Sequence, residues 1–222
     1  MSALEELSLE VASCTACILH RSRTHAVPGE GPERVEIMLI GEGPGYNEDQ
    51  QGRPFVGPSG RLLEKWLALI GLTREQVYIA NVVKCRPPDN RDPLPSEVET
   101  CRPFLERQIE LLDPRLIVTL GRYSMERYFS GSKISQVHGR ARRDGSRIYL
   151  PLYHPAYILR NGTAAPAAEA DFCKIPRLLA RLHEVLAEEA RTGPSGAALE
   201  SAPLPEEGPP SEAEGPKQLR MF

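Results

Sequence analysis

Four short apolar runs, rich in β-branched residues, alternate along this chain with amphipathic patterns of helical period. The runs are VEIMLI (35–40), VYIANVV (77–83), RLIVTL (115–120) and RIYLPLY (147–153). Apolar runs of this length are typical of parallel strands that are buried on both faces. Strands that alternate with helices form a sheet with right-handed crossovers and helices on both sides. The sequence therefore predicts an α/β fold with three α/β/α layers around a central four-stranded parallel sheet.

Helical patterns fill the intervals between the apolar runs. The predicted helices cover residues 59–70, 96–112, 122–129 and 168–191. The first ends at Gly71, and the second opens with Ser96 and Glu99 in the spacing of a capping box. Pro176 is expected to kink or break the last helix. Folds of this kind bind ligands beyond the carboxyl ends of the strands, so functional residues are expected there.

Composition divides the 222 residues into a folded part and a tail. From Thr192 onward the residues are mainly Gly, Pro, Ser, Ala and Glu, which bury too little apolar area to offset the entropy of ordering. We therefore expect a domain over 1–191, a disordered acidic linker over 192–216 and a short amphipathic end, KQLRMF, over 217–222. No apolar stretch approaches the roughly 20 residues of a membrane span, and no signal-peptide pattern opens the chain. A cytoplasmic location is expected.

The formal net charge of −3 conceals a neutral domain. The tail accounts for all of it, because its two basic residues face five acidic ones, at positions 200, 206, 207, 212 and 214. Within the domain, HGRARRDGSR (138–147) is a basic run that could contact the phosphates of a nucleic acid. The alternative is a solvated hairpin, and the sequence leaves both interpretations open.

The five cysteines are more often metal ligands or reactive thiols than disulfides in a chain expected to be cytoplasmic. Cys14 and Cys17 form a C-x2-C pair, and Cys85 follows the second apolar run. Cys101 lies 16 residues later, within the second predicted helix. Four thiolates suit either zinc or an iron–sulfur cluster, and the spacing does not separate them. Cys173 has an apolar helical context and is expected to be a packed thiol.

The stretch GEGPGYNEDQQGRPFVG (41–57) has the outline of a phosphate-binding loop that follows a strand. However, Tyr46 stands where a dinucleotide fingerprint needs glycine, and the stretch contains no Gly-Lys-Ser/Thr sequence. The loop instead presents Glu42 and Glu48 near the aromatic Phe55. Carboxylates beside an aromatic ring suit a flat polar ligand and a cationic transition state better than an anion.

Two other strand ends carry polar residues that are expected in the same region. Asn81 lies in the second apolar run, and His154 directly follows the fourth. Taken singly, each is more typical of a satisfied buried amide or of a turn histidine. Together with Glu42 and Phe55 they define a candidate pocket at the place where this fold binds ligands.

In these motifs the chain resembles the family 4 uracil-DNA glycosylases, the iron–sulfur class of bacteria and archaea. The resemblance covers residues 1 to about 190. It rests on the C-x2-C pair at 14–17, GEGPG at 41–45, GRPFVGPSG at 52–60, NVVKCRPP at 81–88, Cys101 and HPAYILR at 154–160. It implies the α/β/α fold of that family and a 4Fe-4S cluster on Cys14, Cys17, Cys85 and Cys101. It also implies a monofunctional hydrolase that flips uracil out of DNA, cleaves its N-glycosidic bond and leaves an abasic site, in base excision repair of deaminated cytosine.

The resemblance also implies roles for the candidate residues. Phe55 would stack on the flipped uracil, Asn81 would read its O4 and N3–H edge, and His154 would bind O2 as negative charge develops there. Glu42, with Glu48 as a second candidate, would stabilise the oxocarbenium ion or orient the attacking water. The remaining substrate contacts are expected at Gly41, Gly43 and Asn90.

Two other functions remain open at this point. A damage-binding or scaffolding protein would keep the fold and the cluster without the chemistry, and a zinc-bound nucleotide hydrolase would use the cysteines differently. The end of the tail adds a partner, because Gln218–Phe222 resembles the Gln-Leu-x-Leu-Phe peptide that binds the bacterial sliding clamp. The expected protein is a monomer that binds uracil-containing DNA at the nucleoid, with no membrane association.

Overall fold

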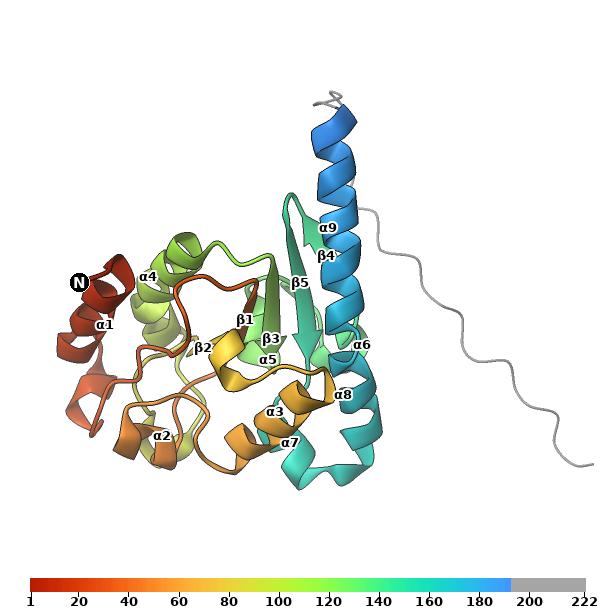
Figure 1. Ribbon diagram of the computed structural model, residues 1–222. Helices are drawn as coiled ribbons and strands as arrows, with labels where there is room; N and C mark the ends of the chain where they lie inside the picture. Colours follow the sequence, from red (N-terminus) through yellow and green to blue (C-terminus); the bar gives the residue numbers. More distant parts are fainter. Residues whose placement is uncertain (193–222) are drawn as a thin grey trace, which may run out of the picture.

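The computed structural model describes residues 1–192, and its centre is a five-stranded sheet with the strand order β2-β1-β3-β5-β4 (Figure 1). The strands are β1 (Ile37–Gly41), β2 (Tyr78–Asn81), β3 (Leu116–Leu120), β4 (Arg142–Asp144) and β5 (Arg147–Leu152). Strands β2, β1, β3 and β5 run parallel, so the predicted four parallel strands are confirmed. The fifth strand, β4, is short and pairs antiparallel with β5. The sequence does not predict this strand, because its residues, RRD, have no apolar position.

Helices cover both faces of the sheet. They are α1 (Ala3–Ser13), α2 (Tyr46–Gln51), α3 (Pro58–Leu69), α4 (Pro95–Leu112), α5 (Arg122–Glu126), α6 (Ile134–Val137), α7 (Pro155–Arg160), α8 (Ala165–Phe172) and α9 (Ile175–Thr192). Short 3-10 turns are η1 (Ile18–Arg21), η2 (Arg74–Gln76), η3 (Pro88–Asn90) and η4 (Gly162–Ala164). In Figure 1, α1 lies beside α4, while α9 runs along β5 and continues past the edge of the sheet.

The core has two layers because neighbouring strand residues point to opposite faces of the sheet. In β1, Leu39 faces a cluster that includes Trp66 of α3 and Phe172 of α8. Its neighbour Ile40 faces a second cluster, which includes Leu105 of α4. Each of these side chains is nearly inaccessible to solvent. The α/β class and the three-layer architecture predicted from the sequence are therefore confirmed.

Two predicted helix boundaries have different outcomes. The capping box at Ser96 and Glu99 is wrong, because α4 begins at Pro95 and the carboxylate of Glu97 accepts the Leu94 N–H at 2.8 Å. A break in the last predicted helix is confirmed, but it lies just before Pro176: α8 ends at Phe172 and α9 begins at Ile175, so Pro176 is in the first turn of α9.

The order of the strands determines where a ligand site lies. Strand β1 has β2 on one side and β3 on the other, so the connection from β1 leads to one side and the connection from β2 crosses to the opposite side. A crevice at such a switch point is the usual ligand site of an open α/β sheet. Gly41 ends β1, Asn81 ends β2, and His154 follows β5 at the same edge.

Some expectations concern other parts of the chain. Residues 193–216 of the predicted linker and the predicted clamp peptide at 217–222 lie outside the described residues. Thr192, which the sequence analysis assigned to the linker, is the last residue of α9. Among residues 1–192, no helix combines the length and the apolar character that crossing a bilayer requires.

Candidate functional site

The carboxyl ends of β1 and β2 bring three of the predicted residues together. Gly41 and Asn81 are register partners in the two parallel strands. A Cβ atom on residue 41 would lie 2.4 Å from Asn81 Oδ1 and 2.7 Å from two ring atoms of Phe55, so only glycine fits there. Asn81 Oδ1 is buried, and it has no hydrogen-bond partner within residues 1–192. A buried acceptor without a partner is costly, so this oxygen is available to a donor on a ligand or a water molecule.

Phe55 is held in place by a strained loop. Its φ of 51° lies in the left-handed region, which costs a non-glycine residue on the order of 1–3 kcal/mol. Arg74 stabilises this conformation by donating to the carbonyl of Phe55 at 2.8 Å and to that of Pro54. Gly60 of α3 leaves room for the same carbonyl, since a Cβ there would lie 1.8 Å from the Phe55 oxygen. The ring is thus fixed before any ligand arrives.

His154 reaches the site from the end of β5. It caps α7, and its Nδ1 accepts the backbone N–H of Ala156 at 3.1 Å. An accepting Nδ1 carries no proton, so the neutral ring carries its proton on Nε2. Burial, and to a smaller extent the positive charge of Arg160, lowers the pKa of His154 to about 4. His154 is therefore a neutral N–H donor near pH 7.

Glu42 follows β1 and is half-buried. Burial raises the pKa of its carboxyl group, and the negative charge of Asp92 raises it further. Arg122 and Arg160 act in the opposite direction. Asp92 and Arg122 also form an ion pair with each other, which places opposed charges beside Glu42. Asp92, Arg122 and Arg160 thus affect Glu42 through their charges and not through hydrogen bonds. The carboxylate oxygens of Glu42 therefore remain available to a ligand or a water molecule.

Glu48 has a different environment. Its Oε1 accepts the N–H groups of Val56 at 2.9 Å and Gly57 at 2.8 Å. Its Oε2 accepts the N–H of Gly45 at 3.2 Å. Hydrogen bonds of backbone N–H groups to a carboxylate are among the stronger ones in proteins. Glu48 therefore ties together both ends of the loop that carries Phe55.

The other two predicted substrate contacts have protein partners of their own. Asn90 is exposed, and its Oδ1 accepts a hydrogen bond from Arg86 Nε at 2.7 Å. The Arg86 guanidinium lies 5.2 Å from the ring centroid of Tyr46. A Cβ on Gly43 would lie 2.7 Å from Val83 Cγ2, so this glycine allows close packing of the loop. Within residues 1–192, the Asn90 side chain is thus hydrogen-bonded to Arg86 and not to Gly41, Asn81 or Phe55.

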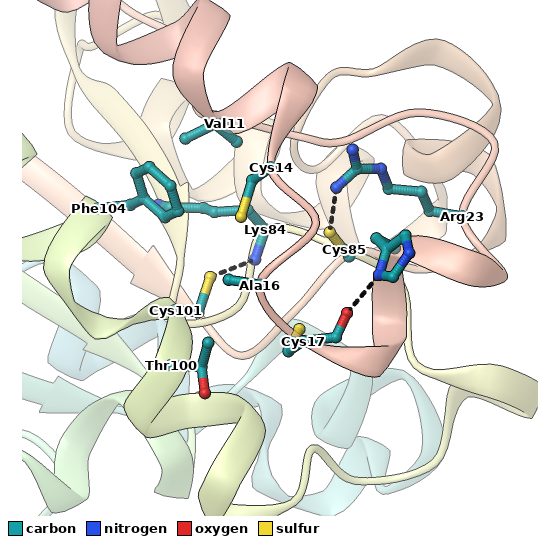
Figure 2. Close-up of a pocket in the computed structure, with 11 residues that line it drawn as sticks. Val11, Cys14, Ala16, Cys17, Arg23, Lys84, Cys85, Thr100, Cys101 and Phe104 are labelled. Carbon is teal, nitrogen blue, oxygen red and sulfur yellow. Dashed lines mark hydrogen bonds between the residues drawn. The ribbon is translucent and has the colours of Figure 1, made fainter.

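The four predicted ligand cysteines surround one pocket, as Figure 2 shows. They come from the end of α1, the start of η1, the segment after β2 and the middle of α4, as Cys14, Cys17, Cys85 and Cys101. Within residues 1–192, no three His, Cys, Asp or Glu side chains converge closely enough to hold a single metal ion. Cys173 is exposed at the end of α8, so the expectation of a packed thiol is wrong.

Two of these thiols accept hydrogen bonds from the surrounding protein. Arg23 Nη1 donates to Cys85 Sγ at 3.0 Å, and the Lys84 backbone N–H donates to Cys101 Sγ at 3.3 Å. Burial raises the pKa of both thiols, that of Cys101 to about 11, while Arg23 and Lys84 oppose this effect. A bound metal would favour the thiolates instead, because its positive charge stabilises them. The pocket is therefore suited to sulfur ligation of a metal group.

The basic run at 138–147 leads from the end of α6 into the β4–β5 hairpin, which begins at Arg142. Arg143 pairs with Glu189 of α9, and Arg147 pairs with Asp113. The guanidinium carbon of Arg142 lies 5.0 Å from the ring centroid of Phe129 and 5.9 Å from that of Tyr149. These contacts favour the hairpin interpretation over a phosphate-binding surface.

Several residues that shape the site were missed by the sequence analysis. Arg74, Asp92 and Arg122 lie in loops or at a helix start, where no periodic pattern marks them. Lys84 could have been singled out from the sequence, because it interrupts an apolar run directly before a cysteine. Its contacts are nevertheless with residues that only the fold brings close.

The three-layer sheet, the residues at its strand ends and the cysteine pocket agree with the expectation of a DNA glycosylase, and comparisons with known proteins show the class. The family model described as "Uracil DNA glycosylase superfamily" matches residues 28–179, so the chain belongs to this superfamily. The curated "Type-4 uracil-DNA glycosylase" of Sulfurisphaera tokodaii is 47% identical over 188 residues, which cover 80% of this chain and 86% of the relative. Its namesake in Archaeoglobus fulgidus is 44% identical over 195 residues, covering 84% and 98%.

Further relatives separate the branches of the superfamily. The "Type-4 uracil-DNA glycosylase" of Thermotoga maritima is 47% identical over 161 residues, which cover 71% of this chain and 84% of the relative. The "Type-5 uracil-DNA glycosylase" of Thermus thermophilus is 35% identical, and its match covers 45% of this chain. Within the superfamily, the chain belongs with the type-4 enzymes.

Proposed function

We propose that this protein excises uracil from DNA by hydrolysis of the N-glycosidic bond, and that the pocket around Gly41 holds the flipped base. The orphaned Asn81 Oδ1 carries this proposal. Uracil presents an N3–H donor to such an acceptor, whereas the N3 of cytosine is itself an acceptor. The mismatched pair would leave two buried acceptors facing each other, at a cost of about 1–3 kcal/mol. Asn81 thus selects uracil over the base from which it forms by deamination.

Phe55 provides the stacking surface. Phe55 is 5% exposed as a residue, and backbone contacts of its loop fix it, so the side chain loses little freedom when a base stacks on the ring. Base–aromatic stacking contributes on the order of 1–3 kcal/mol. This offsets part of the few kcal/mol that flipping a base from the duplex costs.

His154 and Glu42 act on opposite charges as the bond breaks. The electron pair of the N-glycosidic bond moves into the uracil ring, and the Nε2–H of the neutral His154 stabilises the charge that develops at O2. The sugar becomes positive, and Glu42 stabilises it or orients the water that adds to it. We assign the catalytic carboxylate to Glu42 rather than Glu48, since the oxygens of Glu48 accept backbone N–H groups.

The cysteine pocket would hold a 4Fe-4S cluster, as the resemblance to the iron–sulfur class of uracil-DNA glycosylases implies. Four thiols line one pocket, and two of them accept hydrogen bonds at sulfur, which is the ligand set that such a cluster uses. When bound, the cluster would supply covalent ties between the N-terminal segment, the end of β2 and α4. Its role would be architectural.

The decisive experiment is a glycosylase assay on DNA with uracil opposite guanine, opposite adenine and in a single strand. We expect alkali-labile abasic sites and released uracil with at least one substrate, and none with cytosine in the same position. A damage-binding protein without chemistry would shift the DNA in a gel and leave it stable to alkali, which is the result that would overturn the proposal.

Three finer expectations from the sequence are also proposals. The peptide Gln218–Phe222 lies outside the described residues and would bind a sliding clamp, so deletion of 217–222 should abolish co-elution with the clamp. If the intact protein never co-elutes, this proposal is wrong. A monomeric state should appear in light scattering as a mass near 24.6 kDa. A glycosylase that acts on genomic DNA would be located in the cytoplasm with the nucleoid.

A further inference from the structure

One fully buried lysine contacts the backbone of the uracil-reading residue. Lys84 is 1% exposed, and it lies three positions after Asn81. Its Nζ donates to the backbone carbonyl of Asn81 at 2.9 Å and to Oε1 of Gln108 at 2.6 Å. Both acceptors are uncharged. The ammonium group therefore bridges the end of β2 and the middle of α4.

Gln108 is itself held on its other side. Its Nε2 donates to the carbonyl of Pro28 at 2.7 Å and to the hydroxyl of Tyr78 at 3.1 Å. The Lys84 backbone is equally constrained, because its N–H donates to Cys101 Sγ at 3.3 Å and its carbonyl accepts the Val27 N–H at 2.7 Å. The position of the Lys84 side chain is therefore set from both ends.

Burial of a lysine side chain costs free energy, because its ammonium group loses its hydration. An apolar side chain of similar length would pack there without the cost of desolvating an ammonium group. Asn81, in contrast, needs external support, because its Oδ1 has no partner within residues 1–192 that could set the direction of the amide. A hydrogen bond to its carbonyl fixes the backbone from which the amide projects.

We propose that Lys84 is a positioning residue for uracil recognition: it ties the carboxyl end of β2 to Gln108 and so holds the Asn81 amide toward the base. Because α4 carries both Gln108 and Cys101, the helix that holds one cysteine ligand also sets the orientation of the base-reading amide. This inference rests on the proposed uracil excision and adds a residue that contacts neither the base nor the sugar.

The test is the Lys84→Met variant of the full chain, which keeps the length of the side chain and removes its donors. We expect the dissociation constant for free uracil, measured by calorimetric titration, to rise at least fivefold. Binding to a duplex with a stable abasic-site analogue should be unchanged, because that ligand does not use the Asn81 amide. A purely structural role for Lys84 would lower the melting temperature and affect both ligands equally or neither.

Lys174→Met is the matched control, since Lys174 Nζ also donates to a backbone carbonyl, that of Gly139 at 3.2 Å, and to a side-chain oxygen, Asp171 Oδ1 at 2.8 Å. These contacts lie outside the Lys84–Gln108 pair, so this variant should leave uracil affinity unchanged. If Lys84→Met does not fold, Gln108→Met decides, because it removes the acceptor of Lys84 and should also weaken uracil binding. Normal uracil affinity in the folded variant overturns the inference while the proposed function stands. Failure of the wild-type protein to bind or excise uracil overturns both.

Discussion

The rings of Phe55 and His154 lie with their centroids 5.6 Å apart and their planes tilted by 32°. Phe55 comes from the loop after β1, and His154 comes from the end of β5, so two strands of the sheet supply the two rings. Gly41 lies against the Phe55 ring, where a Cβ would come within 2.7 Å of it. The proposed base-stacking ring and the ring proposed to stabilise the departing base are thus held next to each other by the fold.

Replacement of His154 by alanine should slow the release of uracil under single-turnover conditions at least tenfold. This corresponds to about 1.4 kcal/mol of transition-state stabilisation from the Nε2–H. His183→Ala is the control, because His183 is exposed and pairs at 2.6 Å with Glu36. Glu36 directly precedes β1, at the end of the strand opposite to Gly41. Equal rates in the two variants would contradict the assignment of His154.

The pH dependence of uracil release should reflect Glu42. Its pKa is raised by burial and by Asp92, so the carboxyl group stays protonated to a higher pH than an ordinary glutamate. The rate should therefore fall with decreasing pH already above the usual glutamate range of about 4.3. Asp92→Asn should move this acidic limb to lower pH, and Arg122→Ala should move it to higher pH. Shifts in the reverse directions would contradict the role of Glu42.

His154 should add no limb of its own near neutral pH. Its pKa is lowered to about 4, so the ring is neutral on both sides of pH 7. A titration of His154 followed by NMR should show no protonation between about pH 6 and 8, where an ordinary histidine with a pKa near 6.5 titrates. Protonation in that range would show that the ring acts as a cation.

Replacing each candidate carboxylate by glutamine should have different effects on activity and stability. Glu42→Gln should fold like the wild-type protein and lose uracil release. Glu48→Gln should lower the free energy of unfolding by about 1–3 kcal/mol, because it places an NH2 group against backbone N–H donors. Denaturant midpoints and single-turnover rates together provide the measurement. A stable, inactive Glu48→Gln protein would reverse the assignment.

Gly41→Ala should remove uracil binding without unfolding the protein. The added methyl group would lie 2.4 Å from Asn81 Oδ1 and would push the amide and the Phe55 ring out of position. Gly162→Ala is the control, since a Cβ at residue 162 has no heavy atom within 4 Å. Uracil titrations of both variants test this, and tight uracil binding by Gly41→Ala would place the pocket elsewhere.

The cluster proposal is tested by cysteine replacement. Cys101→Ala should lose iron and visible absorbance and should melt at a lower temperature, because α4 would no longer be tied to the N-terminal segment. Cys173→Ala should keep both iron and absorbance, since Cys173 is exposed and lies outside the pocket. Bound zinc in place of iron in the purified protein would overturn the proposal.

The fold was largely predictable, because parallel strands buried on both faces are marked by local runs of apolar residues. The edge strand β4 was not, because RRD has no apolar signal and becomes a strand only by pairing with β5. The start of α4 was misplaced for a similar reason. Glu97 accepts the Leu94 N–H and also pairs with Arg91, so a loop contact selected the cap over the Ser96–Glu99 pattern.

The sequence by itself determined the α/β class and predicted the cysteine set and the pocket residues, because periodicity and motif order are properties of the chain. Only the tertiary structure decided the surroundings of each group. In the folded chain, the carboxylate of Glu48 accepts the N–H groups of Val56 and Gly57. Asn81 Oδ1, by contrast, has no hydrogen-bond partner within residues 1–192. The fold also joined Lys84 to Gln108, 24 positions later. Such contacts depend on the path of the backbone between the two residues, which no local pattern records.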